Sequence, residues 1–555
     1  MRKNIILLIF LLMVSIISIP CFGQKKSETL IIFHIDLNSV SLREDYIRKW
    51  LKNAADMGYN AVLWEVENEI QWKTCPECVS PDAFSKKQFQ DILNYSRELG
   101  LQPIPLLQTI GHAEYVLQHK KYFPLREDPD RYDCYCTSNP DVRKFLKKWI
   151  AEYLDIFGDI KYFHLGGDEA YAFASCPVCS VKAAECGANT LYAEHILDIA
   201  QPILAKGIRP GIWCDMIMQE PDNIVALPKE FVFWDWNYWD GDETPDRVMV
   251  WGQGLRSKDQ ITDEIKKSFP EIVDDDGNLQ AFYTTNVLKR LGYDVILCSG
   301  ARTYGDGVFA GENNHHVPNI IGAAKKTVET EILGTCVTSW AIRIPNFETQ
   351  QAWFYLAPLT LQHPDFSHNE LLIQTSQDIF GVKNEDFFSA ITLIGQSFPF
   401  ANNKTTGIQW TNLKDSHPAP PGFLKELIVK WKSSENETTW KNNLNVIINV
   451  PVKIQDGINQ LNKFIPLAKG EFETLSAWSK AAYFQYWSAF IANEIVNRAD
   501  GKSERSPEEM VELLQSLRRE YKSWAETWMT SASAEQNTGL IYDAIINYFQ
   551  NCYNE

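Results

Sequence analysis

Residues 231–236 read FVFWDW, and this near-continuous apolar run is of the kind that decides the fold. Comparable runs stand at 31–37 (IIFHIDL) and 61–67 (AVLWEVE). A strand that is buried on both faces is apolar along its whole length, whereas a strand with one wet face alternates. The runs therefore predict strands of a buried parallel sheet.

The apolar runs recur through the first two thirds of the chain, and helical patterns separate most of them. Eight β/α units in series predict an α/β fold, a (β/α)8 TIM barrel, over residues 24–365. The competing fold, a doubly wound open sheet, rarely runs to eight regular units. The predicted strands are 30–38, 60–68, 102–109, 161–169, 208–216, 231–239, 293–301 and 333–341.

The pattern changes after residue 365. Helical signals at 457–468, 471–498, 506–529 and 538–553 predict a C-terminal, mainly α-helical domain over residues 366–555. A long polar stretch, 240–278, predicts an enlarged loop after the sixth strand, on the barrel face that carries active sites.

The composition limits the function classes. The 555 residues carry 71 acidic and 53 basic side chains, a net charge of -18. This balance argues against binding nucleic acid or an anionic membrane surface, because both need a basic face. The chain also has 18 tryptophans. Their wide apolar faces suit either large cores or stacking on sugar rings.

The first 23 residues have the features of a targeting signal. Arg2 and Lys3 precede an apolar stretch over 5–19, a break at Pro20 and small residues, which predicts a secretory signal peptide over 1–23. The apolar stretch is too short for a membrane span, and we expect no later segment of the chain to be long and apolar enough to cross a bilayer. We therefore expect an exported protein, periplasmic or secreted. A lipid anchor on Cys21 is the alternative.

Two adjacent carboxylates end the fourth predicted strand, where the sequence 162–170 reads YFHLGGDEA. In a barrel this strand end belongs to the catalytic rim. Gly166 and Gly167 allow other groups to approach the backbone closely. Asp168 and Glu169 are thus the leading catalytic candidates, ahead of a solvated loop or a helix N-cap.

The run HLGGDE at 164–169 resembles the His-x-Gly-Gly-Asp-Glu signature of the family 20 glycoside hydrolases, the β-N-acetylhexosaminidases. A second run, QTIGHAEYVL at 108–117, is similar to the Gly-His stretch of that family, and closest to its hexosaminidase D branch. The resemblance covers residues 30 to about 362. It implies a substrate-assisted reaction that needs no cofactor.

The resemblance also assigns roles to the pair. Glu169 would protonate the leaving oxygen and then activate water, and a nearby anion and a partly dry pocket predict a raised pKa for it. Asp168 would orient the substrate's acetamido group, whose oxygen attacks the anomeric carbon to form an oxazolinium intermediate. The expected reaction is retaining release of terminal β-linked GlcNAc or GalNAc from glycans.

An apolar cage for the acetamido group is expected at the strand ends. Four tryptophans stand there, with core packing as the alternative for each. Tyr238 is expected to bond the acetamido oxygen, and Arg343 the sugar hydroxyls. His164 is predicted to hold the carboxylates from behind, with a core role as the alternative. The full predicted substrate-binding set is His112, Trp213, Asp215, Trp234, Trp236, Tyr238, Trp340 and Arg343.

The sequence departs from the family at the first strand, which lacks the arginine that binds sugar hydroxyls in many members. Asp36 and Glu67 are the predicted substitutes. Two alternatives to an exo-acting enzyme stay open. One is an endo-acting or disaccharide-releasing enzyme of the lacto-N-biosidase kind, using the loop 240–278. The other is a glycan-binding protein without turnover.

Two Cys-Pro-x-Cys motifs follow the second and fourth strands. Cys75, Cys78, Cys176 and Cys179 together predict a structural zinc site of four thiolates, if the barrel loops bring the motifs together. Disulfides are the rival in an exported protein, and free thiols the third possibility. A closed site of this kind would hold loops and do no chemistry. The sequence does not indicate an oligomeric state.

Overall fold

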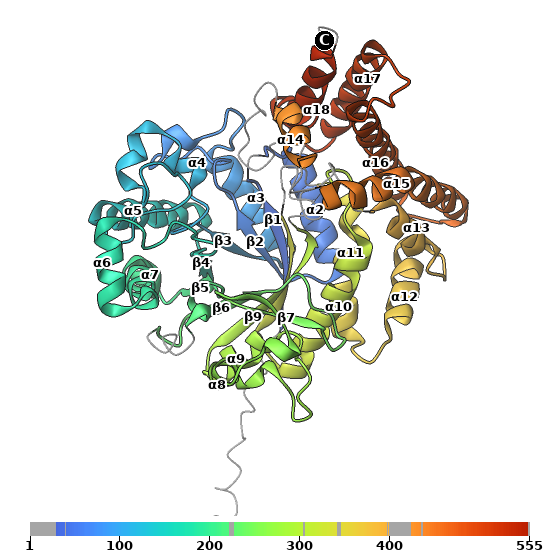
Figure 1. The fold of residues 1–555 in the computed structure, drawn as a ribbon. Helices are drawn as coiled ribbons and strands as arrows, with labels where there is room; N and C mark the ends of the chain where they lie inside the picture. The colour runs from blue at the N-terminus through green and yellow to red at the C-terminus, as the bar shows by residue number, and fades with distance from the viewer. Residues whose placement is uncertain are drawn as a thin grey trace, which may run out of the picture.

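A computed structural model describes residues 29–38, 40–220, 227–303, 306–340, 346–396, 398, 423–433 and 437–552. Within these ranges, eight parallel strands close into a barrel (Figure 1). This confirms the TIM barrel and the order of the predicted strands. The strands are β1 (Leu30–Asp36), β2 (Ala61–Glu65), β3 (Gln102–Leu106), β4 (Tyr162–His164), β5 (Arg209–Trp213), β6 (Val232–Trp236), β9 (Asp294–Arg302) and β10 (Gly334–Ser339).

Helices cover the outside of the barrel, and local signals fix their ends. Ser85 and Gln88 form a capping box at the start of α3, and Gly58 ends α2 in the left-handed conformation, with φ 100°. The main helices of this layer are α2 (Glu44–Met57), α3 (Lys86–Glu98), α5 (Pro140–Phe157), α7 (Ala188–Leu204), α9 (Tyr283–Arg290), α10 (Asn313–Thr330) and α11 (Gln351–Gln362). Shorter helices, α4 (Glu114–Leu117) and α6 (Pro177–Cys186), lie in the loops after β3 and β4.

The loop after β6 is more ordered than the polar composition of 240–278 predicts. It contains an antiparallel hairpin, β7 (Arg247–Val250) and β8 (Gly254–Ser257), followed by α8 (Asp263–Ser268). Val248 and Val250 are buried while Arg247 is exposed, which is the alternation of a half-buried strand. Strands of four residues are too short for this period to stand out in the sequence.

The C-terminal region is helical, as predicted. Figure 1 shows its helices, coloured from yellow to red, gathered on the side of α2 and α11. The elements are α12 (His368–Phe380), α13 (Asp386–Ile394), α14 (Phe423–Trp431), α15 (Glu437–Phe464), α16 (Phe472–Ala499), α17 (Pro507–Ala525) and α18 (Ser531–Asn551). Trp478 and Trp528 are fully buried, consistent with core packing.

The helical region supports two loops of the catalytic face. The Arg43 N–H, in the loop after β1, donates to the Trp528 carbonyl at 2.9 Å, and Leu42 pairs with Met529. In the loop after β9, the Phe309 ring lies 5.3 Å from the rings of both Phe484 and Tyr521. The helices therefore fix the loops that border the site, and they do so at the barrel's carboxyl end.

The predicted signal peptide, residues 1–23, and Cys21 lie outside the described residues, so export stays a prediction. Within the described ranges, no helix combines the length and the apolar character that crossing a bilayer requires.

Candidate active site

The Asp168–Glu169 pair follows β4 on a tightly constrained turn. Gly166 and Gly167 have positive φ angles of 63° and 92°. A Cβ on Gly166 would overlap the Gln108 side chain, and one on Gly167 would overlap the Tyr192 hydroxyl. The turn therefore needs both glycines. Glu169 itself has φ 42°, a conformation that non-glycine residues rarely adopt and that strains the backbone at the pair.

His112 joins the two sequence motifs. Its Nε2 lies 3.3 Å from Asp168 Oδ2 and 3.4 Å from Glu169 Oε2. Burial works against a charged imidazole, but the two carboxylates outweigh it, so the pKa of His112 is raised well above its ordinary value. This shift favours the protonated imidazole, whose charge offsets the repulsion between the two carboxylates.

Asp215, just past β5, is a positioning residue. Its Oδ2 accepts the backbone N–H of Glu169 at 3.0 Å, and its Oδ1 accepts the Trp236 indole N–H at 3.3 Å. Burial, and then the charge of Asp168, raise the pKa of Asp215 to about 7. The carboxyl thus ties the catalytic pair to the neighbouring aromatic side chains.

Tyr171 contacts Glu169 directly and is absent from the predicted set. Its hydroxyl donates to Glu169 Oε1 at 2.6 Å. Partial burial and this bond raise the pKa of Tyr171 above its ordinary value. The sequence signal that could have identified Tyr171 is its position two residues after Glu169, because the turn allows the two side chains to meet.

His164 acts on the pair through the backbone. Its Nδ1 accepts the Gly166 N–H at 2.9 Å, which fixes the turn two residues before Asp168. The ring is fully buried, and burial lowers its pKa well below the ordinary value. The ring also packs on Trp213 and Trp234 at centroid distances of 4.4 and 4.8 Å. His164 is therefore surrounded as a core histidine is, which was the alternative role.

The four tryptophans fall into two pairs. Trp213 and Trp234 are 0% and 1% exposed and belong to the apolar cluster that fills the barrel. Inward-facing side chains of a barrel fill its interior, and these two do so here, while the expectation that they wall a substrate pocket stays a prediction. Trp236 and Trp340 are only partly buried and pack against the same cluster.

Tyr238 completes the aromatic group. The Trp340 indole N–H donates to its hydroxyl at 2.8 Å, and the Trp236 ring lies 5.3 Å from its ring. The β7–β8 hairpin adds Trp251, whose ring lies 4.8 Å from that of Trp236. We call Trp236, Tyr238, Trp340 and Trp251 the aromatic wall. Trp251 was missed because its hairpin was not predicted.

A buried carboxyl cluster lies at the ends of β1 and β2. Asp36 and Glu67, the predicted substitutes for the arginine, are both buried there. Glu65 accepts from Gln108 Nε2 at 2.9 Å, and burial raises its pKa to about 7. Burial, and then neighbouring Glu65, raise the pKa of Glu67 well above its usual range. Arg343 lies outside the described residues.

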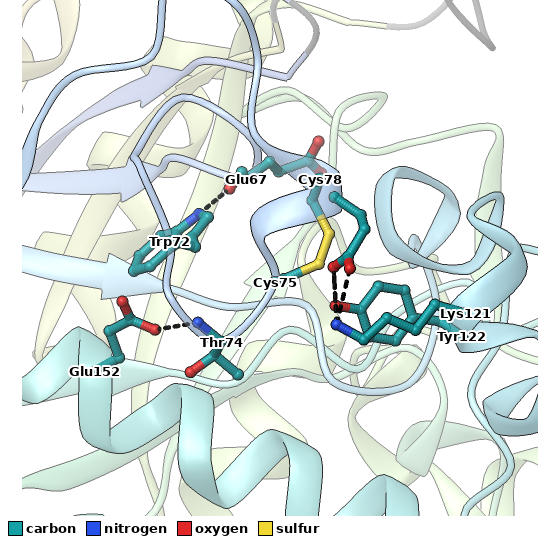
Figure 2. Close-up of a disulfide and its surroundings, with 9 residues drawn as sticks. Glu67, Trp72, Thr74, Cys75, Cys78, Lys121, Tyr122 and Glu152 are labelled. Carbon is teal, nitrogen blue, oxygen red and sulfur yellow. Dashed lines mark hydrogen bonds and ion pairs between the residues drawn. A yellow bond between two sulfur atoms is a disulfide. The ribbon is translucent and has the colours of Figure 1, made fainter.

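The two Cys-Pro-x-Cys motifs do not meet, which corrects the predicted site of four thiolates. Cys75 and Cys78 form a disulfide with each other (Figure 2). Around it, the Glu77 carboxylate accepts from Lys121 Nζ at 2.8 Å and from the Tyr122 hydroxyl at 2.7 Å. The loop after β3 therefore covers the first motif. The sulfurs of Cys176 and Cys179 lie instead beside Cys136.

Part of the chain that contains this site is similar to a known enzyme family. Residues 64–255 match the family model described as glycosyl hydrolase family 20, catalytic domain. This segment of the chain therefore resembles the catalytic domain of the family 20 glycoside hydrolases. The matched segment contains His112, Asp168, Glu169 and Asp215, and so the constellation described above.

Two curated relatives match part of the chain. A lacto-N-biosidase of Bifidobacterium bifidum is 26% identical over 231 residues, which are 39% of this chain and 20% of that protein. Hexosaminidase D of Homo sapiens is 25% identical over 218 residues, 37% of this chain and 44% of that protein. The match thus spans less than half of either relative. A solved chitobiase of Flavobacterium johnsoniae is 16% identical over 92% of this chain and 78% of its own, with a TM-score of 0.43.

Proposed function

We propose that this protein is a retaining exo-β-N-acetylhexosaminidase that releases terminal β-linked GlcNAc or GalNAc from glycans. One observation carries the proposal: the Asp168–Glu169 pair follows β4 inside the segment that matches the family 20 catalytic domain, and His112 bridges its two carboxylates. A hexosaminidase reaction needs one acid near the leaving oxygen and one carboxylate near the acetamide, and this pair offers both.

In the proposed reaction, the acetamido oxygen of the substrate attacks the anomeric carbon while Glu169 gives its proton to the leaving oxygen. The bond to the leaving group breaks as the oxazolinium ring closes. Asp168 accepts the acetamido N–H and offsets the positive charge that develops there. Glu169, now ionised, then takes a proton from water, which opens the ring with net retention. No step calls for a cofactor.

The neighbours of the pair have roles in this scheme. The Tyr171 hydroxyl and the His112 ring each contact one Glu169 oxygen, so both restrict the acid's rotamer. Asp215 holds the Glu169 backbone. Trp340 and Tyr238 supply a rigid apolar surface with one hydroxyl, which suits a methyl-bearing acetamido group. Holding a proton donor rigidly near its target is worth several kcal/mol in such reactions.

A disaccharide-releasing activity is the second candidate, and the β7–β8 hairpin favours it. The hairpin extends the aromatic wall outward through Trp251, beyond the strand ends. An added ring of this kind suits stacking of a second sugar. One relative of the chain is named a lacto-N-biosidase.

Hydrolysis of nitrophenyl β-GlcNAc and β-GalNAc by wild type and by Glu169→Gln tests the first candidate. We expect wild type to hydrolyse at least one of them and Glu169→Gln to lose about 10²–10⁴-fold in rate. Glu98→Gln is the matched control, because Glu98 is exposed at the end of α3, and it should keep the full rate.

Nitrophenyl β-lacto-N-bioside distinguishes the candidates. Turnover of this substrate alone would replace the exo-acting assignment with a disaccharide-releasing one. Binding of glycans with no turnover of any of the three substrates would instead establish a lectin.

We also propose that the chain is exported through residues 1–23. N-terminal sequencing of protein from a secreting host should find the mature chain beginning near residue 24. Incorporation of labelled fatty acid that Cys21→Ser abolishes would show a lipid anchor in its place. Intact residues 1–23 on the folded protein would contradict export.

A further inference from the structure

Four side chains converge between the loops after β3 and β4. Glu127 and Cys136 come from the loop after β3, while Cys176 and Cys179 begin α6 in the loop after β4. One ligand atom from each lies within 4.8 Å of every other. The group belongs to neither the catalytic pair nor the aromatic wall.

The sulfur separations fit a metal ion better than a disulfide. Cys136 Sγ lies 3.7 Å from both Cys176 Sγ and Cys179 Sγ. A disulfide needs about 2.05 Å between sulfurs. Thiolates about 2.3 Å from a tetrahedral zinc ion are about 3.8 Å apart, which is the edge of that tetrahedron. The two separations from Cys136 therefore match the spacing around a shared ion, and the Cys176 and Cys179 sulfurs lie within 4.8 Å of each other.

Glu127 supplies the fourth position. Its carboxylate is 1% exposed, with Oε2 at 3.3 Å from Cys179 Sγ. A tetrahedral edge between a zinc-bound oxygen and a zinc-bound sulfur is about 3.5 Å. Within the described ranges, no lysine or arginine pairs with this carboxylate. A buried carboxylate among sulfurs is costly unless a cation compensates it.

From this geometry we infer that Glu127, Cys136, Cys176 and Cys179 bind one structural zinc ion. Three thiolates and one carboxylate close a tetrahedral site with no open position, so the ion would hold structure and not react. The rival disulfides explain less, because three cysteines can form one disulfide at most and would leave a thiol beside a buried carboxylate.

Surrounding groups orient the proposed ligands. The Cys176 N–H donates to Glu127 Oε1 at 3.0 Å, and the Cys179 N–H donates to Cys176 Sγ at 3.3 Å. Ser138 Oγ lies 3.1 Å from Cys179 Sγ. Such bonds to ligand atoms are the usual support of a metal site. Leu191 and Phe173 pack against the sulfurs, which limits access of water.

The site would fix the loop that carries the catalytic pair. The chain runs only seven residues from Glu169 to Cys176, and the ion would tie this segment to the loop after β3, which carries His112. Zinc would therefore stabilise the contact between His112 and the two carboxylates without touching substrate.

Zinc content of the full-length protein, purified without chelator, tests the inference. We expect about one zinc per chain in wild type. Cys136→Ser and Cys176→Ser should each lose it. Two control variants should keep zinc. One is Cys186→Ser, which removes the exposed thiol at the end of α6, and the other combines Cys75→Ser with Cys78→Ser. Circular dichroism would check that each variant folds.

A second variant separates metal binding from a packing role. Glu127→Cys would complete a site of four thiolates, so it should keep zinc and release it to a chelator more slowly than wild type. A packing role for Glu127 predicts no such gain. Wild-type zinc no higher than that of Cys136→Ser, or a disulfide of Cys176 with Cys179 or Cys136 in peptide mapping of wild type, would overturn the inference.

Discussion

Asp168 and Glu169 are positioned by hydrogen bonds and a strained backbone, whereas Trp236 and Trp340 are positioned largely by ring packing. The carboxylate pair uses His112, Asp215 and glycines with positive φ. Trp236 and Trp340 pack against the apolar cluster that fills the barrel. Under the proposed reaction, charge stabilisation and sugar binding are divided between these two neighbouring regions. Asp215 contacts both through its two oxygens.

The largest effect that follows from this division is on the carboxylate side. We expect Asp168→Asn to lower kcat by about 10²–10³-fold with little change in KM, because Asp168 would act on charge that develops only in the transition state. Steady-state kinetics on the better nitrophenyl substrate measures this. An effect confined to KM would break the division.

The aromatic side should respond in the opposite sense. Trp340→Ala removes the ring that donates to Tyr238 at 2.8 Å, and we expect KM to rise about tenfold, ~1.4 kcal/mol, with kcat reduced less. Trp340→Phe is the matched control, since it keeps an apolar ring and should recover part of the binding. A fall in kcat alone would place this side chain in the chemistry instead.

The pH dependence of stability should also separate the two sides. Burial raises the pKa of Glu65 to about 7 in the folded protein, against an ordinary value of 4.5 for a solvated glutamate. Between these values the folded state keeps a proton that the unfolded state has lost, so stability falls as pH rises. Glu65→Gln removes this loss and keeps an oxygen that accepts from Gln108.

Unfolding midpoints at about pH 5 and pH 8 test this expectation. The stability of Glu65→Gln relative to wild type should increase as pH rises, by up to about 1–3 kcal/mol of unfolding free energy. Trp340→Phe, on the uncharged side, should keep a constant difference from wild type. A Glu65→Gln difference that is also constant would show that Glu65 ionises normally.

The smallest expected effect belongs to the hairpin. Trp251→Ala should leave the hydrolysis of nitrophenyl β-GlcNAc unchanged and weaken the binding of a longer oligosaccharide about two- to tenfold, the range of one aromatic contact. Comparing KM for the two substrates measures it. Equal loss on both would mean that Trp251 only supports Trp236.

The fold was readable from the sequence because the barrel strands are apolar on both faces, and all of the predicted strands lie in the barrel in the predicted order. The Asp168–Glu169 motif and its partner His112 were readable because glycine and histidine stand at fixed offsets. What could not be read depends on contacts between loops. Cys75 and Cys176 each begin a Cys-Pro-x-Cys motif, yet Cys75 forms a disulfide within its own motif and Cys176 lies beside Cys136 of a neighbouring loop.

The tryptophans show the same limit at the level of burial. Trp234 and Trp236 stand two residues apart on one strand, and the sequence assigned both to the pocket. Side chains two residues apart share a face of the strand, but depth along the barrel axis separates them. Trp234 fills the interior, and Trp236 reaches the rim.

Inhibition by a thiazoline that mimics the oxazolinium ring tests the central claim most directly, since the claim is that the substrate's acetamide is the nucleophile. The proposed reaction predicts competitive inhibition of nitrophenyl β-GlcNAc hydrolysis with an inhibition constant at least about 10²-fold below KM, as expected for an analogue of a high-energy species. Hydrolysis that proceeds unaffected by the thiazoline at concentrations near KM would contradict substrate assistance.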